Sequence, residues 1–244
     1  MADYNDPRTT TTGFGSVPRA GGQVVFDAGL RKHMLSIYNY MTSGVLLTGI
    51  VAMLTANSGL AYTFATGPLM WLVALAPLAI VFAMSFGANK FSKTTLQGMY
   101  WAFAVLMGLS LSTIFLVYTG GSIAVTFFAT AAAFAGLSLW GYTTQKDLSG
   151  WGSFLVMGVV GLVVASVINL FIGSAPLMYA ISFLGVLIFA GLTAYDTQKL
   201  KEQYVHLRGT DWAGKAVVLG ALNLYLDFIN MFLFLLRFMG SSRN

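Results

Sequence analysis

Seven apolar stretches, each of roughly 20 residues, run through this chain and constrain its fold more than any other feature. A helix of ~20 apolar residues is long enough to cross the ~30 Å hydrocarbon core of a bilayer. Within hydrocarbon, every backbone polar group needs a partner inside the protein, and a helix meets that need segment by segment. The sequence therefore predicts an all-α polytopic membrane protein, with spans near residues 35–56, 68–88, 96–118, 123–142, 154–172, 177–197 and 216–238.

Composition supports this class of protein and leaves little room for another. Of the 244 residues 57% are hydrophobic and only 9% are charged, whereas soluble domains are about 25% charged. Residues 1–30 contain a run of threonines and several glycines, which predicts a disordered tail beside one seven-helix domain at 31–240. The absence of cysteine excludes disulfides, thiolate metal sites and cysteine nucleophiles.

The basic residues gather in every second connection, and therefore at one end of the spans. The connections near residues 57–67, 119–122 and 173–176 carry no charge, while the tail and the other connections hold 11 of the 13 lysines and arginines. By the positive-inside rule this basic side, with the N-terminus, is cytoplasmic, and the C-terminus lies outside. The net charge of +5 thus reflects topology, and we expect no nucleic-acid partner.

The last span carries a carboxylate, Asp227, close to its middle. A charge at that depth costs at least ~2.5–3.5 kcal/mol on insertion scales, so such residues usually have a function. On a helix Gly220, Asn223, Asp227 and Asn230 share one face, and the other faces carry leucine, isoleucine, phenylalanine and methionine. We expect this polar stripe to face protein or water.

A second carboxylate, Asp196, lies near the end of the sixth span. The sixth and seventh helices are consecutive and antiparallel, so the two aspartates are candidates for contact. Their expected depths differ, because Asp227 is roughly 15–18 Å along its helix from Lys215 while Asp196 is roughly 5–8 Å from Lys199. They meet only if the seventh helix begins earlier than residue 216 or the sixth helix enters deeper.

Two carboxyl groups that meet in a low-dielectric site share a proton, because both cannot ionise cheaply. Such a pair senses pH and, once deprotonated, offers hard oxygen ligands to Ca²⁺. The alternative is structural: each aspartate bonds a neighbouring helix, and Asp196 forms an interfacial ion pair with Lys199.

Two similar hexapeptides end the fourth and sixth spans, GYTTQK at residues 141–146 and AYDTQK at 194–199. Two related pairs of helices would explain this sequence similarity, and so would a shared way of ending a helix in polar and basic residues. A single six-residue match does not establish a structural repeat.

Two longer motifs resemble a known family. The run LNLYLDFINMFLFLLRFMG at residues 222–240 and the run TAYDTQKL at 193–200 resemble the last and sixth spans of the Bax inhibitor-1 (transmembrane BAX inhibitor motif) family, most closely its bacterial members. The resemblance implies six helices wrapped around a central seventh, and a pair, Asp196 and Asp227, that senses pH and gates a Ca²⁺ leak. The resemblance also implies an arginine at the cytoplasmic end of the second span, which in bacterial members can bind the aspartates through two hydrogen bonds. At that place this chain has Lys90, whose ammonium group acts as a point charge.

Three functions follow from these observations. The first is a pH-sensitive Ca²⁺ leak protein of the bacterial inner membrane without a cofactor, in which Asp196 and Asp227 bind protons or metal and Asn223, Asn230 and Lys90 support the ion path. The second is a regulatory partner of a membrane-bound protease or a suppressor of cell death, which would dock through the tail and the loop at 198–215. The third, an intramembrane aspartyl protease, requires a Gly-x-Gly-Asp motif where this chain has Tyr225, Leu226 and Asp227, so we expect no enzyme.

Overall fold

The computed structural model describes residues 28–243, which form helices and one isolated antiparallel bridge between Tyr118 and Ser242. Residues 1–27 of the predicted tail lie outside the described part, and residues 28–30 already belong to the first helix. In chain order the helices are α1 (Ala28–Asn57), α2 (Leu60–Ala65), α3 (Leu69–Gly87), α4 (Lys93–Leu111), α5 (Ile114–Val117), α6 (Gly120–Thr143), α7 (Ser149–Ile172), α8 (Ala175–Leu207) and α9 (Trp212–Met239).

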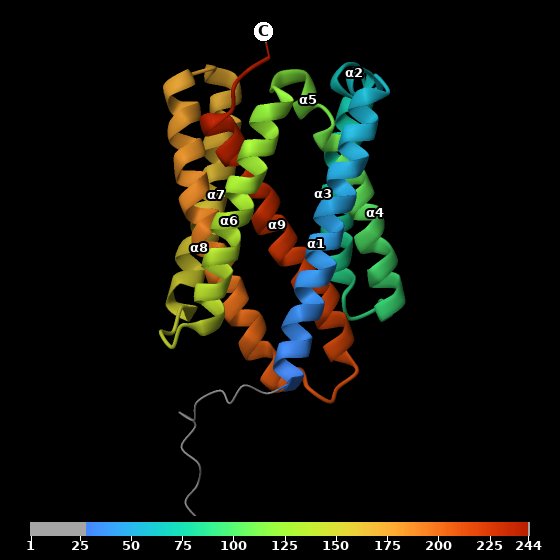
Figure 1. The fold of residues 1–244 in the computed structure, drawn as a ribbon, viewed down its shortest axis with the longest axis vertical. Coiled ribbons are helices and arrows are strands. Elements are labelled where there is room, and N and C mark those ends of the chain that lie inside the picture. Colours follow the sequence, from blue (N-terminus) through green and yellow to red (C-terminus); the bar gives the residue numbers. More distant parts are fainter. Residues whose placement is uncertain (1–27, 244) are drawn as a thin grey trace, which may run out of the picture.

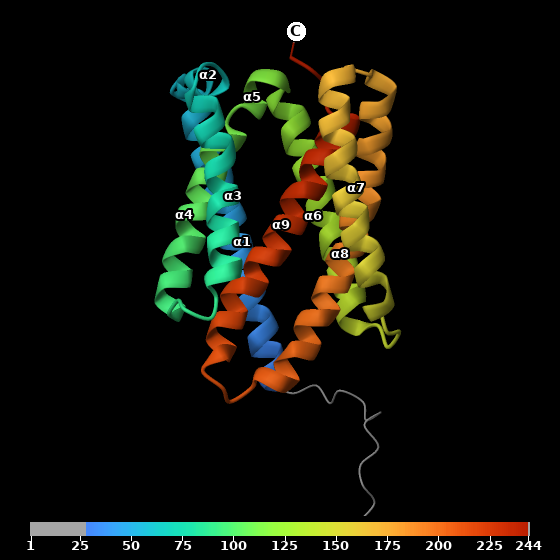
Figure 2. The ribbon, with the colours of Figure 1, turned by 180° about the vertical axis from the view of Figure 1, so that it is seen from behind.

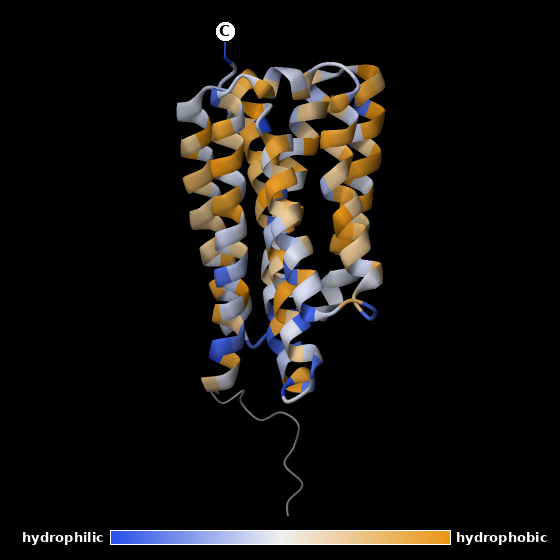
Figure 3. Cartoon of the chain, turned by 90° about the vertical axis from the view of Figure 1, so that its right-hand side faces the viewer, coloured by the Kyte–Doolittle hydropathy of each residue, from blue (hydrophilic) through white to orange (hydrophobic). Residues whose placement is uncertain are grey.

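Seven segments in the described part are long and apolar enough to cross a membrane, which confirms the predicted number of spans. The short helices α2 and α5 lie in connections, and α5 continues the span begun by α4. Figure 3 shows hydrophilic positions gathered toward the end of the molecule where α8 and α9 are joined.

The predicted loop at 198–215 is wrong for most of its length. Helix α8 continues to Leu207 and α9 begins at Trp212, so a turn at 208–211 is all that separates them. The segment after Lys199 is rich in good helix formers, which lets α8 extend beyond the apolar stretch. Gly209 adopts a φ of 79° in the turn, a left-handed conformation that glycine reaches without steric cost and that commonly ends helices.

Helix α9 is the centre of the bundle, as expected. In its most apolar window 61% of the residues are buried, against 11% in that of α7. Figures 1 and 2 show α9 crossing the molecule obliquely between the other helices, and it packs mainly against α8, α1, α6 and α4. The six remaining spans do not enclose α9 equally, because α3 packs chiefly on α4 and α7 packs on α8.

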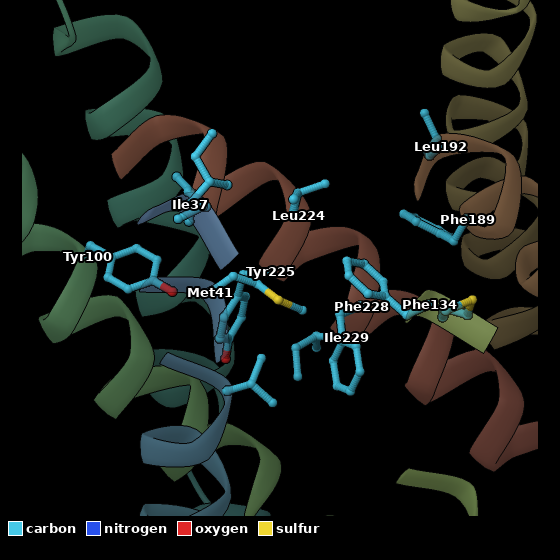
Figure 4. Packing of buried hydrophobic residues seen from close by; sticks show 14 of the residues in the cluster. Ile37, Met41, Tyr100, Phe134, Phe189, Leu192, Leu224, Tyr225, Phe228 and Ile229 are labelled. Atoms are coloured by element: carbon cyan, nitrogen blue, oxygen red, sulfur yellow. The ribbon is translucent and has the colours of Figure 1, made fainter. Parts of the chain in front are cut away.

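Aromatic side chains fill the contacts of α9 with its neighbours (Figure 4). Tyr225 lies edge-on to Phe103 of α4 with ring centroids 5.0 Å apart, while Phe228 meets Phe134 of α6 at 5.6 Å. The Tyr225 hydroxyl also pairs with Thr48 Oγ1 of α1 at 2.7 Å. Edge-to-face ring pairs of this kind stabilise packing by ~0.5–1.5 kcal/mol beyond area burial.

Helices α6 and α8 approach most closely where the two similar hexapeptides meet. A side chain at Gly141 would collide with the backbone carbonyl oxygen of Ala194, and these two residues open the two hexapeptides. Small residues that let helix backbones come together are a common basis of packing in lipid, where no hydrophobic force acts between helices.

Replacing Gly141 by alanine should destabilise the protein by about 1–3 kcal/mol, because backbone must move to admit the new methyl group. Thermal unfolding in detergent measures this change. The control is Gly136→Ala in the same helix, since no atom lies within 4 Å of a Cβ at that position. Equal stability of the two variants would show that the contact between α6 and α8 is looser than described.

The cysteine-free chain also allows a direct test of orientation. A cysteine at Ser58, in the turn between α1 and α2, should react with a membrane-impermeant maleimide added outside intact spheroplasts. A cysteine at Lys90, in the turn between α3 and α4, should react only after lysis, because the positive-inside rule places that turn in the cytoplasm. The reverse pattern would invert the topology.

Candidate functional site

The extended hairpin of α8 and α9 changes the depth of both predicted aspartates. Asp196 lies eleven residues before the end of α8 and Asp227 lies fifteen residues after the start of α9, or roughly 16 and 22 Å along the helix axes. The oblique path of α9 (Figure 1) shortens the second distance when it is projected on the membrane normal. The mismatch expected from the sequence is thereby removed.

The side chains of Asp196 and Asp227 meet between α8 and α9, close enough for their carboxyl groups to hydrogen-bond when one is protonated and to repel each other when both are charged. A hydrogen bond between two carboxyl groups requires a proton on one of them, because ionised carboxylates are acceptors only. Lys199, one helical turn after Asp196, is a favourable charge for that aspartate. The alternative of an Asp196–Lys199 interaction therefore coexists with the contact between the aspartates.

Asp227 is the more enclosed member of the pair. Its side chain is 4% exposed, and its Oδ2 atom has no hydrogen-bond partner among the residues that the structure describes. Leaving a buried polar group without a partner costs roughly 1–3 kcal/mol, and more for a charged group. This orphaned oxygen is a position at which a proton, a water molecule or a cation would be stabilised.

A row of hydroxyl groups runs beside the pair and joins three helices. Thr197 Oγ1, next to Asp196 in α8, lies 2.9 Å from Ser138 Oγ of α6. Ser138 Oγ in turn lies 2.6 Å from the Tyr38 hydroxyl of α1. Sequence reasoning missed these three residues, because hydroxyl side chains are common in membrane helices and nothing in the sequence places these three together.

The other predicted polar residues do not reach the aspartates. Asn223 and Lys90 are exposed, and Asn230 donates to the carbonyl oxygen of Leu226 in its own helix at 2.8 Å. Within residues 28–243, no hydrogen bond or ion pair connects these three side chains to Asp196 or Asp227. Lys199, and not Lys90, is the cation that acts on Asp196.

The donor set suits a weakly held cation. In the described part of the chain, no histidine, cysteine or further acidic residue joins the two aspartates as a third possible metal ligand. Two carboxylates supply at most four oxygens, whereas Ca²⁺ takes ~6–8. Water and backbone carbonyls would have to complete the shell.

The connection between α6 and α7 holds a carboxylate of a different kind. Asp147 lies outside the spans, and the hydrogen bonds that it accepts from the Ser149 hydroxyl and backbone N–H lower its pKa. This carboxylate therefore stays charged at neutral and mildly acidic pH.

Known proteins resemble the chain over most of its length. Residues 30–244 match the family described as inhibitor of apoptosis-promoting Bax1. The inner membrane protein YbhL of Escherichia coli is 45% identical over 230 residues, which cover 93% of this chain and 98% of that protein. An uncharacterized protein of Caulobacter vibrioides is 46% identical, covering 93% and 96%, and one of Rickettsia prowazekii is 42% identical along the full length of both chains.

The unpartnered oxygen of Asp227 predicts that the negative charge of this side chain does not stabilise the fold. Asp227→Asn should leave the thermal unfolding midpoint unchanged or raise it, because it removes a buried ionisable group at constant size. Tyr225→Phe, two residues away, should lower stability by about 0.6 kcal/mol, the average for a hydrogen bond between membrane helices. A larger loss for Asp227→Asn than for Tyr225→Phe would assign Asp227 a structural role.

Proposed function

Since this chain belongs to the Bax inhibitor-1 family and is a multi-pass protein of the bacterial inner membrane, we propose that it is a Ca²⁺ leak protein controlled by protons on Asp196 and Asp227. The observation that carries the proposal is the contact between two carboxyl groups in the interior of the bundle. Aspartates inside a membrane domain commonly mark ion pathways and proton relays.

In the protonated state the shared hydrogen bond holds α8 to α9. This link acts on the most enclosed helix of the molecule, which also packs against α1, α4 and α6. A change in the position of α9 is therefore passed to most of the bundle. The closed state of the proposed leak is the state in which one proton remains on the pair.

Loss of that proton replaces an attraction by a repulsion. Two adjacent negative charges in a low-dielectric site repel strongly, and Lys199 offsets only one of them. The repulsion between the two carboxylates is relieved either when α8 and α9 separate or when a divalent cation binds between them. Both responses favour cation entry, so the proposed leak opens as the pH rises.

The absence of an arginine after the second span supports this direction of gating. A bidentate arginine would hold the deprotonated aspartates closed and release them on protonation, which is the opposite pH dependence. In the described part of the chain, the cation near the pair is Lys199, on the same helix as Asp196. That interaction lies within α8, so it does not tie α8 to another span.

Ca²⁺ flux into dye-loaded liposomes tests the proposal. We expect wild-type protein to conduct more at pH 8 than at pH 6, and expect both Asp196→Asn and Asp227→Asn to abolish the difference, because each removes one titrating partner. Asp147→Asn is the matched control: it removes an exposed carboxylate outside the spans and should keep the wild-type pH profile.

Three outcomes would change the assignment. A wild-type flux that falls with rising pH would keep the pair as sensor but require a latch cation from another helix. A pH profile altered equally by Asp147→Asn would remove the pair from gating. No flux above empty liposomes at either pH would exclude the leak and favour a regulatory membrane protein, such as a partner of a membrane-bound protease.

A further inference from the structure

A groove of about 800 Å³ runs along the bundle between α1 and α6, with Phe228 of α9 among the residues that line it. Its walls are almost entirely apolar, and they include Met41 and Val45 from α1 and Ala131 and Phe134 from α6. The two helices lie on either side of α9 in Figure 1. Neither the pH sensor nor the contacts that build the bundle account for this space.

The groove opens sideways toward lipid. The lining residues Leu35 and Leu46 on α1 and Leu139 on α6 are 49%, 55% and 63% exposed. These residues lie in membrane-spanning segments, so what surrounds them is the hydrocarbon of the bilayer. A lipid chain can enter the groove from the side without any movement of the helices.

The length of the groove fits one leaflet. Arg31 lies in the first turn of α1, and Leu46 lies fifteen residues further on, or roughly 22 Å along the helix. One headgroup layer and half of the hydrocarbon core together measure roughly 20–22 Å. A phospholipid with its headgroup at Arg31 would therefore end near Leu46.

The mouth of the groove is basic. Arg31 is exposed, and no carboxylate among residues 28–243 pairs with it. Lys201 donates to the backbone oxygen of Tyr142, another lining residue, at 2.9 Å, although Glu202 lies near it and offsets part of its charge. A basic side chain beside the membrane attracts anionic lipid headgroups.

We propose that this groove binds one anionic phospholipid of the cytoplasmic leaflet, with the headgroup at Arg31 and an acyl chain between α1 and α6. A membrane helix fits the space less well, since a cylinder about 10 Å wide and 30 Å long occupies roughly 2,400 Å³, three times the volume of the groove. The site does not depend on the proposed leak activity.

The bound lipid would lie close to the aspartates without touching them. Tyr38 and Ser138 line the groove and are hydrogen-bonded to each other, and Ser138 is bonded to Thr197. Thr197 is the neighbour of Asp196 in α8. An acyl chain in the groove thus covers the outer side of the hydroxyl row.

Native mass spectrometry of the protein purified in mild detergent tests this site, with dioleoylphosphatidylglycerol and dioleoylphosphatidylcholine as probes. We expect wild-type protein to retain one phosphatidylglycerol about fivefold more tightly than phosphatidylcholine, the ratio given by about 1 kcal/mol for one basic residue. Arg31→Gln should remove this preference and leave the remaining lipid binding unchanged.

Two variants fill the groove from opposite walls, Ala135→Trp on α6 and Thr42→Phe on α1, and both positions line it. Each should lose the tightly bound lipid, and the use of both guards against one that fails to fold. Val164→Trp, on the exposed face of α7, places a tryptophan outside the groove and should keep the lipid.

Retention of the lipid by both groove variants would show that it is annular, and would overturn the proposal. Equal affinity of the wild type for the two lipids would overturn the assignment of the headgroup to Arg31. A protein dimer that Ala135→Trp and Thr42→Phe both abolish would assign the groove to a second copy of the chain, and would also overturn it.

Discussion

The structure depends on one constraint: the carboxyl group of Asp227 in a membrane helix must be enclosed by protein. Hydrocarbon offers neither hydrogen bonds nor counter-charges, so a helix with such a residue is stable where other helices surround it. Helix α9 accordingly takes the centre, with α8, α1, α6 and α4 around it. The apolar helices α3 and α7, which carry no such group, pack on the outside.

The length of α8 decides where its aspartate lies relative to α9. Helix α8 has 33 residues, more than a bilayer requires, and its extension past Lys199 carries Asp196 away from the membrane edge. The two aspartates meet because the long hairpin and the oblique path of α9 bring their depths together. Lys199 lies one helical turn after Asp196 and acts on that aspartate, as its spacing in the sequence predicts.

The arrangement around α9 is uneven, and this unevenness creates the lipid groove. Helices α1 and α6 both pack on α9 but leave a space between them. The hydroxyl row of Tyr38, Ser138 and Thr197 bridges α1, α6 and α8 at that place. Thr197, which ends this row, follows Asp196 in the sequence of α8.

The sequence by itself determined the seven spans and the two aspartates within them, because hydrophobic length and an intramembrane charge carry their physical cost within one segment. The central place of the last helix followed from the resemblance to a known family. The sequence placed Asn223 and Asn230 with Asp227 on one face, yet the structure joins neither to the pair. Tertiary structure alone decided that the depths of Asp196 and Asp227 match, that Lys90 lies away from them, and that α8 continues through the expected loop. Contact between helices depends on tilt, extension and packing, which arise between segments and leave no periodic signal in any one of them.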